Sequence, residues 1–405
     1  MKEKIYDIII IGGGAAGLFA AASVPGRVSG LILDKAGAPG RKLLMSGAGQ
    51  CNLTHGGSIK DFLNHYGNRG KEIRTTLYQF SNLALTEFFE DRNVPLTERR
   101  DGKVFPASLE AFQVLECLLS EAEKNGFSLL SSCTVSGISP GEVFTVTTSA
   151  GVFRGKKVLV CTGGCSYPAT GSDGAFFRVL RELDIEVTEL RPGLAAVNVE
   201  EYPFSGLSGI SVPAAEIRTE GHQVTGDLLF THKNFSGPGI LHISRYVRPG
   251  SRLEICYCPG RNRQQTESEL TDCRLHSGRK EALTILTGLF PELPAALLRT
   301  VFRGLGFPES MKFADFSAKS AAGFLSRIFA DRYRVSGTAG YGSAMVTVGG
   351  VALREVSAKT WEPKKYPGLY FAGEVLDVDG DTGGYNLQFA FSSARLAVST
   401  AFQTL

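Results

Sequence analysis

The hydrophobic residues near the N-terminus predict a strand, a tight turn and a helix. Ile8–Ile11 form an unbroken run of β-branched residues, as expected for a strand that is buried on both faces. Good helix formers follow at Leu18–Ala22. The turn between them, Gly12-Gly-Gly-Ala-Ala-Gly17, has the G-x-G-x-x-G spacing of a dinucleotide-binding βαβ unit. The pattern predicts a helix N-terminus whose unpaired N–H groups and positive dipole end receive a pyrophosphate.

Each glycine of this turn has a separate expected role. Gly12 permits the tight turn, Gly14 lets a pyrophosphate approach the backbone, and Gly17 lets the helix pack on the strand. A second apolar run, Leu31–Asp34, ends in an acidic residue 20 positions after Gly14, the spacing expected for a carboxylate that hydrogen-bonds an adenosine ribose. The alternative is an ordinary glycine-rich turn with a solvated Asp34. The agreement of spacing, strand and helix favours dinucleotide binding.

The same kinds of pattern continue through the first part of the chain. Helices are expected where apolar residues recur at helical spacing, over 59–66, 71–80, 82–92, 108–124 with Ser108 as N-cap, and 175–183. Strands are expected over 128–135, 143–148, 152–154 and 157–161, with a hairpin over 94–106. The segment Lys35–Ser58 is expected to be a loop, and loops of this length inside a compact domain are usually functional.

The pattern changes after Arg191, where strands dominate and a helical segment follows. Strands are expected over 194–199, 214–219, 224–230 and 252–257, and mostly helix over 261–330. The C-terminal part returns to the first pattern, with strands over 345–351 and 368–372 and an Ala/Ser-rich helix over 387–402. The sequence thus predicts an α/β nucleotide-binding domain that is interrupted by a β-rich domain with a helical insertion.

The composition is that of an ordinary globular protein with two or three domains. The 405 residues are 43% hydrophobic and 20% charged, and a net charge of +3 gives no argument by itself for a nucleic-acid or membrane partner. No apolar stretch approaches the ~18 residues that a transmembrane helix needs. Asp7 and three glycines interrupt the apolar N-terminal segment, so no signal peptide is expected. We therefore expect a cytoplasmic protein.

The eight cysteines are expected to be reduced thiols. They form no C-x-x-C pair, and the six histidines show no metal-binding spacing beside them, so no metal site is predicted. Cys161 and Cys165 leave a flavin disulfide reductase as an alternative. Against it, Cys161 ends a buried strand and Cys165 lies beyond two glycines, whereas such enzymes need a redox pair that faces the flavin.

Three further segments are suited to a long phosphate-containing ligand. In the loop after Asp34, Arg41 and Lys42 can pair with phosphate, unless they are simply solvated, and the small residues beside them offer backbone N–H groups. Thr162-Gly-Gly164 follows a strand and allows close backbone approach. At Gly373–Gln388 a second glycine-rich strand-to-helix joint can place a helix N-terminus against the pyrimidine end of a flavin.

Five sequence blocks resemble the HI0933-like flavoprotein family, whose members include BaiN-like and YhiN-like NAD(P)/FAD-dependent oxidoreductases. The blocks run in order along the chain: Gly12–Gly17, Gly40–Thr54, Thr162–Pro168, Leu229–Pro238 and Gly368–Gln388. The resemblance implies a Rossmann-type FAD-binding domain with non-covalent FAD, a barrel-like domain and a helical subdomain. We assign these to residues 1–190 with 341–405, residues 191–260 with 331–340, and residues 261–330. One departure is Gln50, where the family usually has a basic residue.

The residue pattern and the matching family positions together give one predicted cofactor site. Its members are Gly12, Gly14, Ala15, Ala16, Asp34, Lys35, Arg41, Lys42, Ser46, Gly47, Asn52, Thr162, Gly163, Gly164, Gly373, Glu374, Gly384, Asn386 and Leu387. Only one complete G-x-G-x-x-G is present, so a separate nicotinamide domain is not expected. If NAD(P)H is the electron donor, it must dock transiently at the flavin.

Activities within the family differ: reduction of activated C=C bonds in steroid-like enones, oxidation of small amines, and reduction of uridine in ribosomal RNA. We expect an FAD-dependent oxidoreductase that reduces an activated C=C bond by hydride transfer from flavin N5 with a protein proton donor. The candidate donors are Cys51, His232 and Tyr385. The alternatives are a flavin-dependent amine oxidase, or an FAD-containing protein that binds or modifies RNA.

Basic residues in the helical segment bear on the RNA alternative. They are Arg261, Arg263, Arg279, Lys280, Arg299 and Arg303. Such residues can form an RNA-binding surface, although charged helices are more often solvated faces. The expected partner is therefore a small-molecule substrate or an RNA base. Association with a membrane is not expected, and the sequence does not indicate an oligomeric state.

Overall fold

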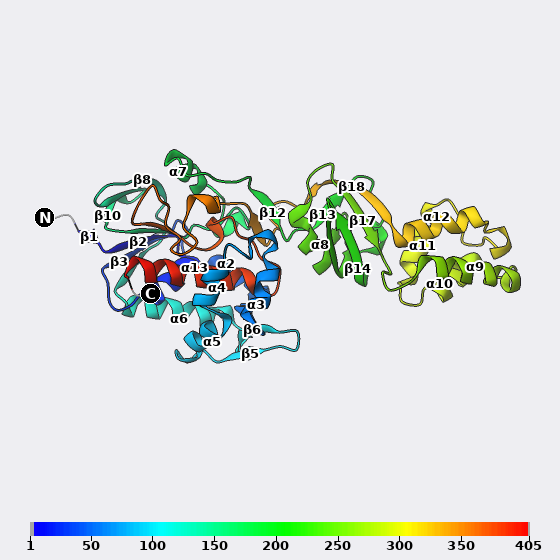
Figure 1. Cartoon of the computed structure of the whole chain (residues 1–405), viewed down its shortest axis with the longest axis horizontal. Coiled ribbons are helices and arrows are strands. Elements are labelled where there is room, and N and C mark those ends of the chain that lie inside the picture. Colours follow the sequence, from blue (N-terminus) through cyan, green and yellow to red (C-terminus); the bar gives the residue numbers. More distant parts are fainter. Residues whose placement is uncertain (1–3, 404–405) are drawn as a thin grey trace. The chain divides into compact units, whose positions relative to one another are not determined.

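The computed structural model describes residues 4–403 and divides into two compact units (Figure 1). The first unit runs to Arg191 and resumes at Met345, and the second is Pro192–Ala344. The first unit is therefore built from two separate stretches of the chain. Each unit has its own architecture and its own hydrophobic core.

A five-stranded parallel sheet is the centre of the first unit. Its strands, in spatial order, are β20 (Leu369–Phe371), β11 (Val158–Val160), β2 (Ile8–Ile11), β3 (Gly30–Leu33) and β7 (Phe127–Leu130). All four residues of β2 are buried, as a strand covered on both faces requires. Helix α1 (Ala15–Ala22) joins β2 to β3, and it packs against α13 (Tyr385–Ala401) and α6 (Ala111–Lys124).

Smaller elements surround this sheet. An outer sheet contains β1 (Ile5–Tyr6), β10 (Gly151–Gly155), β9 (Phe144–Thr148) and β8 (Val135–Ser139), and a second contains β4 (Thr54–His55), β6 (Lys103–Pro106) and β5 (Leu96–Glu98). The other helices are α2 (Arg41–Met45), α3 (Ile59–Phe62), α4 (Arg74–Gln79), α5 (Asn82–Glu90) and α7 (Phe176–Glu182). Two short strands are β12 (Arg191–Gly193) and β19 (Val346–Val348).

Three sequence-based expectations for the first unit are wrong in detail. The strand expected over 128–135 is two strands in different sheets, because Ser132 has a positive φ of 53° and turns the chain after β7. Helix α6 begins at Ala111 with Glu110 as N-cap, because Leu109 has a φ of 58° and separates Ser108 from the helix. The expected loop 35–58 contains α2, β4 and a 3₁₀ turn.

The second unit is a closed six-stranded barrel with a helical insertion. Its strands, in spatial order, are β13 (Val197–Val199), β16 (Phe235–Ser236), β15 (His222–Phe230), β14 (Ser211–Thr219), β17 (Arg252–Cys256) and β18 (Asp331–Thr338). Closure leaves no exposed strand edge. Helix α8 (Pro238–Ile243) packs against β14 and β15.

Four helices lie between β17 and β18 in sequence. They are α9 (Arg263–Ser277), α10 (Ala282–Leu289), α11 (Ala295–Gly304) and α12 (Ala318–Phe329), and they gather beside the barrel (Figure 1). Helix α12 packs on β17 and β18, and the helices share one hydrophobic core with the barrel. The expected class, a Rossmann-type domain with a barrel-like domain and a helical subdomain, is confirmed.

Two further structural properties concern the described residues 4–403. None of their helices combines the length and the hydrophobicity needed to cross a bilayer. In the same part of the chain, no three His, Cys, Asp or Glu side chains come together as metal ligands. All eight cysteines are free thiols.

Candidate cofactor and active site

The first glycine turn has the geometry that its sequence predicts. Gly12 has a φ of 108°, and a Cβ there would lie 2.3 Å from the carbonyl oxygen of Cys161. A Cβ on Gly17 would lie 1.9 Å from the carbonyl oxygen of Gly12. By contrast, a Cβ on Gly14 would meet nothing within 4 Å. Two glycines are therefore required by packing, and the third leaves open space where helix α1 begins, which fits a pyrophosphate.

Asp34 lies directly beside this turn. Its Oδ2 accepts a hydrogen bond of 2.7 Å from the backbone N–H of Gly13, and its Oδ1 accepts one of 2.7 Å from Ala36. The carboxylate therefore braces the turn and is held rigidly after β3, where the sequence predicts a ribose contact. Its neighbour Lys35 forms an ion pair with Asp173.

The loop after Asp34 is folded back onto the first turn. The backbone N–H of Gly40 donates to the carbonyl oxygen of Gly13 at 2.8 Å, and α2 follows with Arg41 exposed. Gly47 and Ala48 have positive φ angles of 56° and 57°, which reverse the chain after α2. The hydroxyl of Ser46 donates to the carbonyl oxygen of Leu43 at 2.7 Å and stabilises this reversal.

Lys42 and Glu374, both predicted cofactor contacts, are bonded to each other. The Lys42 ammonium donates to Glu374 Oε2 at 2.7 Å and to the Ser166 hydroxyl at 2.5 Å. Glu374 Oε1 accepts hydrogen bonds of 2.8 Å from Ser166 and from the N–H of Thr347. Burial raises the pKa of Glu374, but Lys42 and these hydrogen bonds outweigh it and lower the pKa below its ordinary value. The pair ties the Gly40–Thr54 block to the C-terminal joint.

The glycines after β11 differ from each other. Gly163 has a φ of 70° and is partly exposed, together with Thr162. A Cβ on Gly164 would lie 2.3 Å from Thr347 Oγ1. Gly164 is buried and is required for packing against Thr347, so it is the preceding pair that offers accessible backbone.

The C-terminal joint lies beside the first turn. Gly373 has a φ of 75°, and a Cβ there would lie 2.9 Å from the Cβ of Ala16 in α1. Gly384 has a φ of 100°, and a Cβ there would lie 2.4 Å from the carbonyl oxygen of Thr54. Helix α13 starts at Tyr385 with no side-chain cap from Gly384, two residues earlier than the sequence predicts. The first turn and the start of the C-terminal joint are thus in contact at Ala16 and Gly373.

Two asparagines hold this joint. The Asn386 amide accepts from the N–H of Gly380 at 2.8 Å and donates to the carbonyl oxygens of Gly380 and Asp381 at 2.9 and 3.1 Å. Hydrogen-bonding partners assign the Asn52 amide so that it accepts from the N–H of Gly384 at 3.0 Å and donates to Thr54 at 2.9 Å. Both predicted contacts therefore shape the backbone at the start of α13. Leu387 packs partly buried against the core.

The three candidate proton donors have different surroundings. The Cys51 side chain is 0% exposed, and burial raises the pKa of its thiol to about 12 against a weaker opposing hydrogen bond from Ser46. His232 is exposed on the second unit, in the turn between β15 and β16. Burial, with the charges of Asp381 and Asp61, raises the pKa of Tyr385 to about 12.

Cys161 and Cys165 are both buried, and burial strongly raises the pKa of the Cys161 thiol. A redox thiolate is favoured by exposure and by positive charge, so this environment weighs against the disulfide reductase alternative.

The structure adds two histidines that the sequence argument missed. The ring of Tyr385 stacks with His65, with centroids 4.0 Å apart and planes at 13°, and with His55, at 5.4 Å and 15°. His65 Nδ1 is 3.0 Å from Asp381 Oδ2. The sequence signal was weak, because His65 lies in a segment whose apolar spacing indicates packing alone.

Position 50 has a basic neighbour despite the departure from the family pattern. The guanidinium of Arg99, from the turn between β5 and β6, donates to Gln50 Oε1 at 2.6 Å. A positive charge therefore stands beside Gln50, supplied from another part of the chain.

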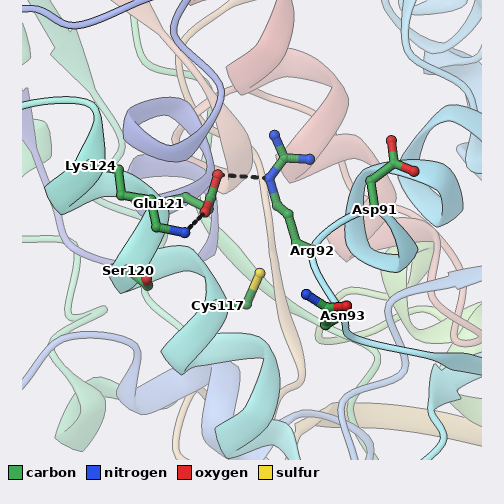
Figure 2. A pocket seen from close by; sticks show the side chains of 7 residues that line it. All are labelled: Asp91, Arg92, Asn93, Cys117, Ser120, Glu121 and Lys124. Atoms are coloured by element: carbon green, nitrogen blue, oxygen red, sulfur yellow. Dashed lines mark hydrogen bonds and ion pairs between the residues drawn. The ribbon is translucent and has the colours of Figure 1, made fainter.

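A pocket between the end of α5 and α6 contains none of the predicted site residues (Figure 2). Glu121 pairs there with Arg92 at 3.0 Å and with Lys124 at 2.6 Å. Burial raises the pKa of Glu121, but the two cations lower it below its ordinary value. Burial and Glu121 raise the pKa of the Cys117 thiol to about 11. Both cations are already paired with Glu121, which weighs against an anion site in this pocket.

The basic residues of the helical subdomain are also largely paired. Arg261 pairs with Glu269 and Glu292, and Arg263 with Glu267. Arg299 and Arg303 both pair with Glu309. This pairing weakens the argument for an RNA-binding surface there and favours a solvated face.

Comparison with known proteins gives a family match over almost the whole chain. A family model described as HI0933-like protein Rossmann domain matches residues 6–400. The ribosomal RNA dihydrouridine synthases of Escherichia coli and Haemophilus influenzae are 31% and 33% identical over 402 residues, covering 96% and 97% of both chains. The 3-dehydro-bile acid delta(4,6)-reductase of Clostridium scindens is 29% identical over 404 residues, covering 96% of this chain and 97% of its own.

Solved structures resemble the fold. A variant of FrdA from Escherichia coli quinol fumarate reductase has a TM-score of 0.52 and 14% identity, covering all of this chain and 71% of its own. A quinol-fumarate reductase with menaquinol molecules has a TM-score of 0.51 and 13% identity, covering all of this chain and 72% of its own. At these identities the likeness shows the fold alone.

Proposed function

The chain belongs to the HI0933-like family of flavin-dependent oxidoreductases, and on this premise we propose that it reduces a carbon–carbon double bond conjugated to a carbonyl group. The named relatives support this reaction class. Dihydrouridine is uridine whose ring C=C bond, conjugated to a carbonyl, has been reduced, and the bile-acid enzyme is named as a reductase of a 3-oxo steroid at positions 4 and 6. One chemistry, addition of hydride and proton across an activated C=C bond, covers both.

One structural observation carries the cofactor part of the proposal. The first glycine turn and the C-terminal joint meet, since a Cβ on Gly373 would lie 2.9 Å from the Cβ of Ala16. Two helix N-termini in one unit can serve two parts of a long dinucleotide. The open space at Gly14 is a cradle that a side chain would fill. These residues fit FAD bound without a covalent link.

We assign the parts of the site as follows. The start of α1 receives the pyrophosphate, and Asp34 accepts from the adenosine ribose. The start of α13 stabilises negative charge on the pyrimidine part of the flavin. Lys42 and Glu374 position the loop that carries Ser46 and Gly47. Bound FAD would supply hydride transfer, and NAD(P)H is the proposed transient donor that reduces it.

The test is a substrate panel with purified, FAD-loaded protein under anaerobic conditions. Bleaching of the flavin by NADH or NADPH in stopped flow would identify the donor. Reoxidation by a steroid dienone or by uridine-containing RNA, with a product that has gained two hydrogen atoms, is the expected result. Flavin reduction by a small amine without any nicotinamide would instead favour the amine oxidase alternative, and protein that binds no FAD would overturn the proposal.

A further inference from the structure

The Tyr385 ring in the first unit stacks with two imidazoles of unlike environment. Both ring nitrogens of His55 face backbone carbonyl oxygens, those of Gly56 and Asp101, at 2.9 Å each. His65 is bonded only through Nδ1, at 3.0 Å from Asp381, and within residues 4–403 its Nε2 has no hydrogen-bond partner. Of the two histidines, His65 alone has a ring nitrogen available to a ligand.

His65 is fixed more firmly than a surface histidine. Besides the side-chain contact, the N–H of Asp381 donates to the carbonyl oxygen of His65 at 2.8 Å. Stacking on Tyr385 at 4.0 Å sets the plane of the ring. A carboxylate at Nδ1 fixes the tautomer that carries hydrogen on that nitrogen and leaves Nε2 free for another partner. The His65 side chain is 37% exposed, so it can exchange protons with solvent, whereas Cys51 is 0% exposed.

Several charged or titratable groups surround this ring. On the joint, Asp381 contacts it directly, and Asp377 is paired with Arg69, which also contacts Glu72. Tyr385 stacks on the His65 ring and also on His55. The charge of Asp61 contributes to the raised pKa of Tyr385, and the Tyr66 hydroxyl donates to the Tyr385 carbonyl oxygen at 2.7 Å. Since Arg69 is already paired, Asp381 is the charged group that directly bonds the imidazole.

We propose that His65 is the catalytic acid of the reduction and that Asp381 is its positioning residue. This inference rests on the proposed function and on the assignment of the flavin to the neighbouring start of α13. The imidazolium Nε2–H bond breaks as a C–H bond forms at the carbon next to the substrate carbonyl. Bound FAD, kept reduced by the nicotinamide donor, would supply the hydride that the other carbon takes. Neutral His65 then takes a proton from water.

The decisive variant is His65→Gln, with His276→Gln as matched control, because His276 is an exposed histidine of α9 in the second unit. Bleaching of the flavin by the nicotinamide should stay at the wild-type rate in both variants. Reoxidation by substrate should fall by roughly 10²–10⁴-fold in His65→Gln, the usual contribution of a general acid. The rate of reoxidation by substrate should be unchanged in His276→Gln. Free imidazole should restore part of the rate to His65→Ala.

A second readout does not depend on turnover. Nitrogen-15 NMR of the histidines, assigned by the signal lost in His65→Gln, should show hydrogen on Nδ1 of His65 in the wild type. Asp381→Ala should give a mixture of tautomers while retaining FAD. A fixed Nδ1–H form in Asp381→Ala would overturn the positioning role.

Three results would overturn the assignment of the acid. They are wild-type reoxidation in His65→Gln, no rescue of FAD-loaded His65→Ala by imidazole, or a larger loss in Cys51→Ala or Tyr385→Phe. A wild-type enzyme that no conjugated C=C compound reoxidises would instead contradict the proposed function, so the two failures are distinguishable.

Discussion

The two glycine joints of the first unit use the same element, a helix that begins after a strand, in different ways. At the first joint, the glycines are set by backbone packing around Gly12 and Gly17, and Gly14 faces open space. At the C-terminal joint, side chains decide the shape, through Asn52, Asn386 and the His65–Asp381 contact. The first joint is a backbone surface suited to phosphate. The second is a polar network suited to holding a reactive ring and a proton.

The difference shows how residue types divide two tasks within the proposed cofactor site. Backbone N–H groups bind phosphate without needing a particular side chain, so glycine spacing alone encodes that task. Proton transfer needs a titratable group at a fixed position, and only tertiary contacts supply that position. Four predictions follow this division, ordered by the expected effect on stability.

Gly12→Ala should have the largest effect. The new methyl would lie 2.3 Å from the Cys161 carbonyl oxygen, on a backbone with a φ of 108°. Strain and clash together should cost roughly 3 kcal/mol or more. Chemical denaturation should show this loss in the free energy of unfolding, and the variant should be purified without flavin. Normal stability in this variant would contradict the packing role of the first joint.

Glu374→Gln should destabilise the unit in a pH-dependent way. Loss of the charged hydrogen bond from Lys42 should cost about 1.5–3 kcal/mol at neutral pH. The folded-state pKa of Glu374 lies below the ordinary value of 4.5, so its contribution is present above pH 4.5 and is lost as the pH falls through the lowered pKa. The difference between wild type and variant should therefore shrink on acidification below pH 4.5. A difference that grows on acidification would contradict the assignment.

Asn386→Ala should loosen the C-terminal joint alone. It removes the acceptor for the Gly380 N–H and two donated hydrogen bonds, which should cost about 1–2 kcal/mol. Asn386→Asp keeps an acceptor and is the matched comparison. Hydrogen exchange should increase around residues 380–384 and remain unchanged at the first joint. Equal changes at both joints would show that they do not act separately.

Gly14→Ala should have the smallest effect on folding and a selective effect on the cofactor. Its φ of −86° suits alanine, and the methyl would meet nothing within 4 Å, so stability should change by less than about 1 kcal/mol. The methyl would occupy the proposed pyrophosphate space. Calorimetric titration with FAD should show at least about tenfold weaker binding, which equals about 1.4 kcal/mol. Wild-type affinity would place the pyrophosphate elsewhere.

The sequence could predict what depends on local pattern. The strand Ile8–Ile11, the roles of Gly12, Gly14 and Gly17, and the second joint near Gly373 follow from spacing that local sterics impose. The β-rich domain with its helical insertion also follows from the change of pattern after Arg191.

What could not be predicted depends on contacts between residues far apart in sequence. Lys42 meets Glu374 across 332 positions, and His65 meets Asp381 across 316. Gly164 shows the same limit in another form, because packing against Thr347, a distant residue, already requires glycine there. Single-residue turns such as Ser132 also escape detection, since a positive φ at serine has no strong sequence signal.

The discontinuous first unit has a consequence for its biosynthesis. Strand β20 is an edge of the central sheet and pairs with β11, yet it is translated after the whole of Pro192–Ala344. Until β20 and α13 have been translated, β11 has an unpaired edge and α1 lacks the packing surface that α13 provides. The second half of the proposed flavin cradle is therefore translated only after the whole second unit, and a complete cradle cannot hold the cofactor before that point.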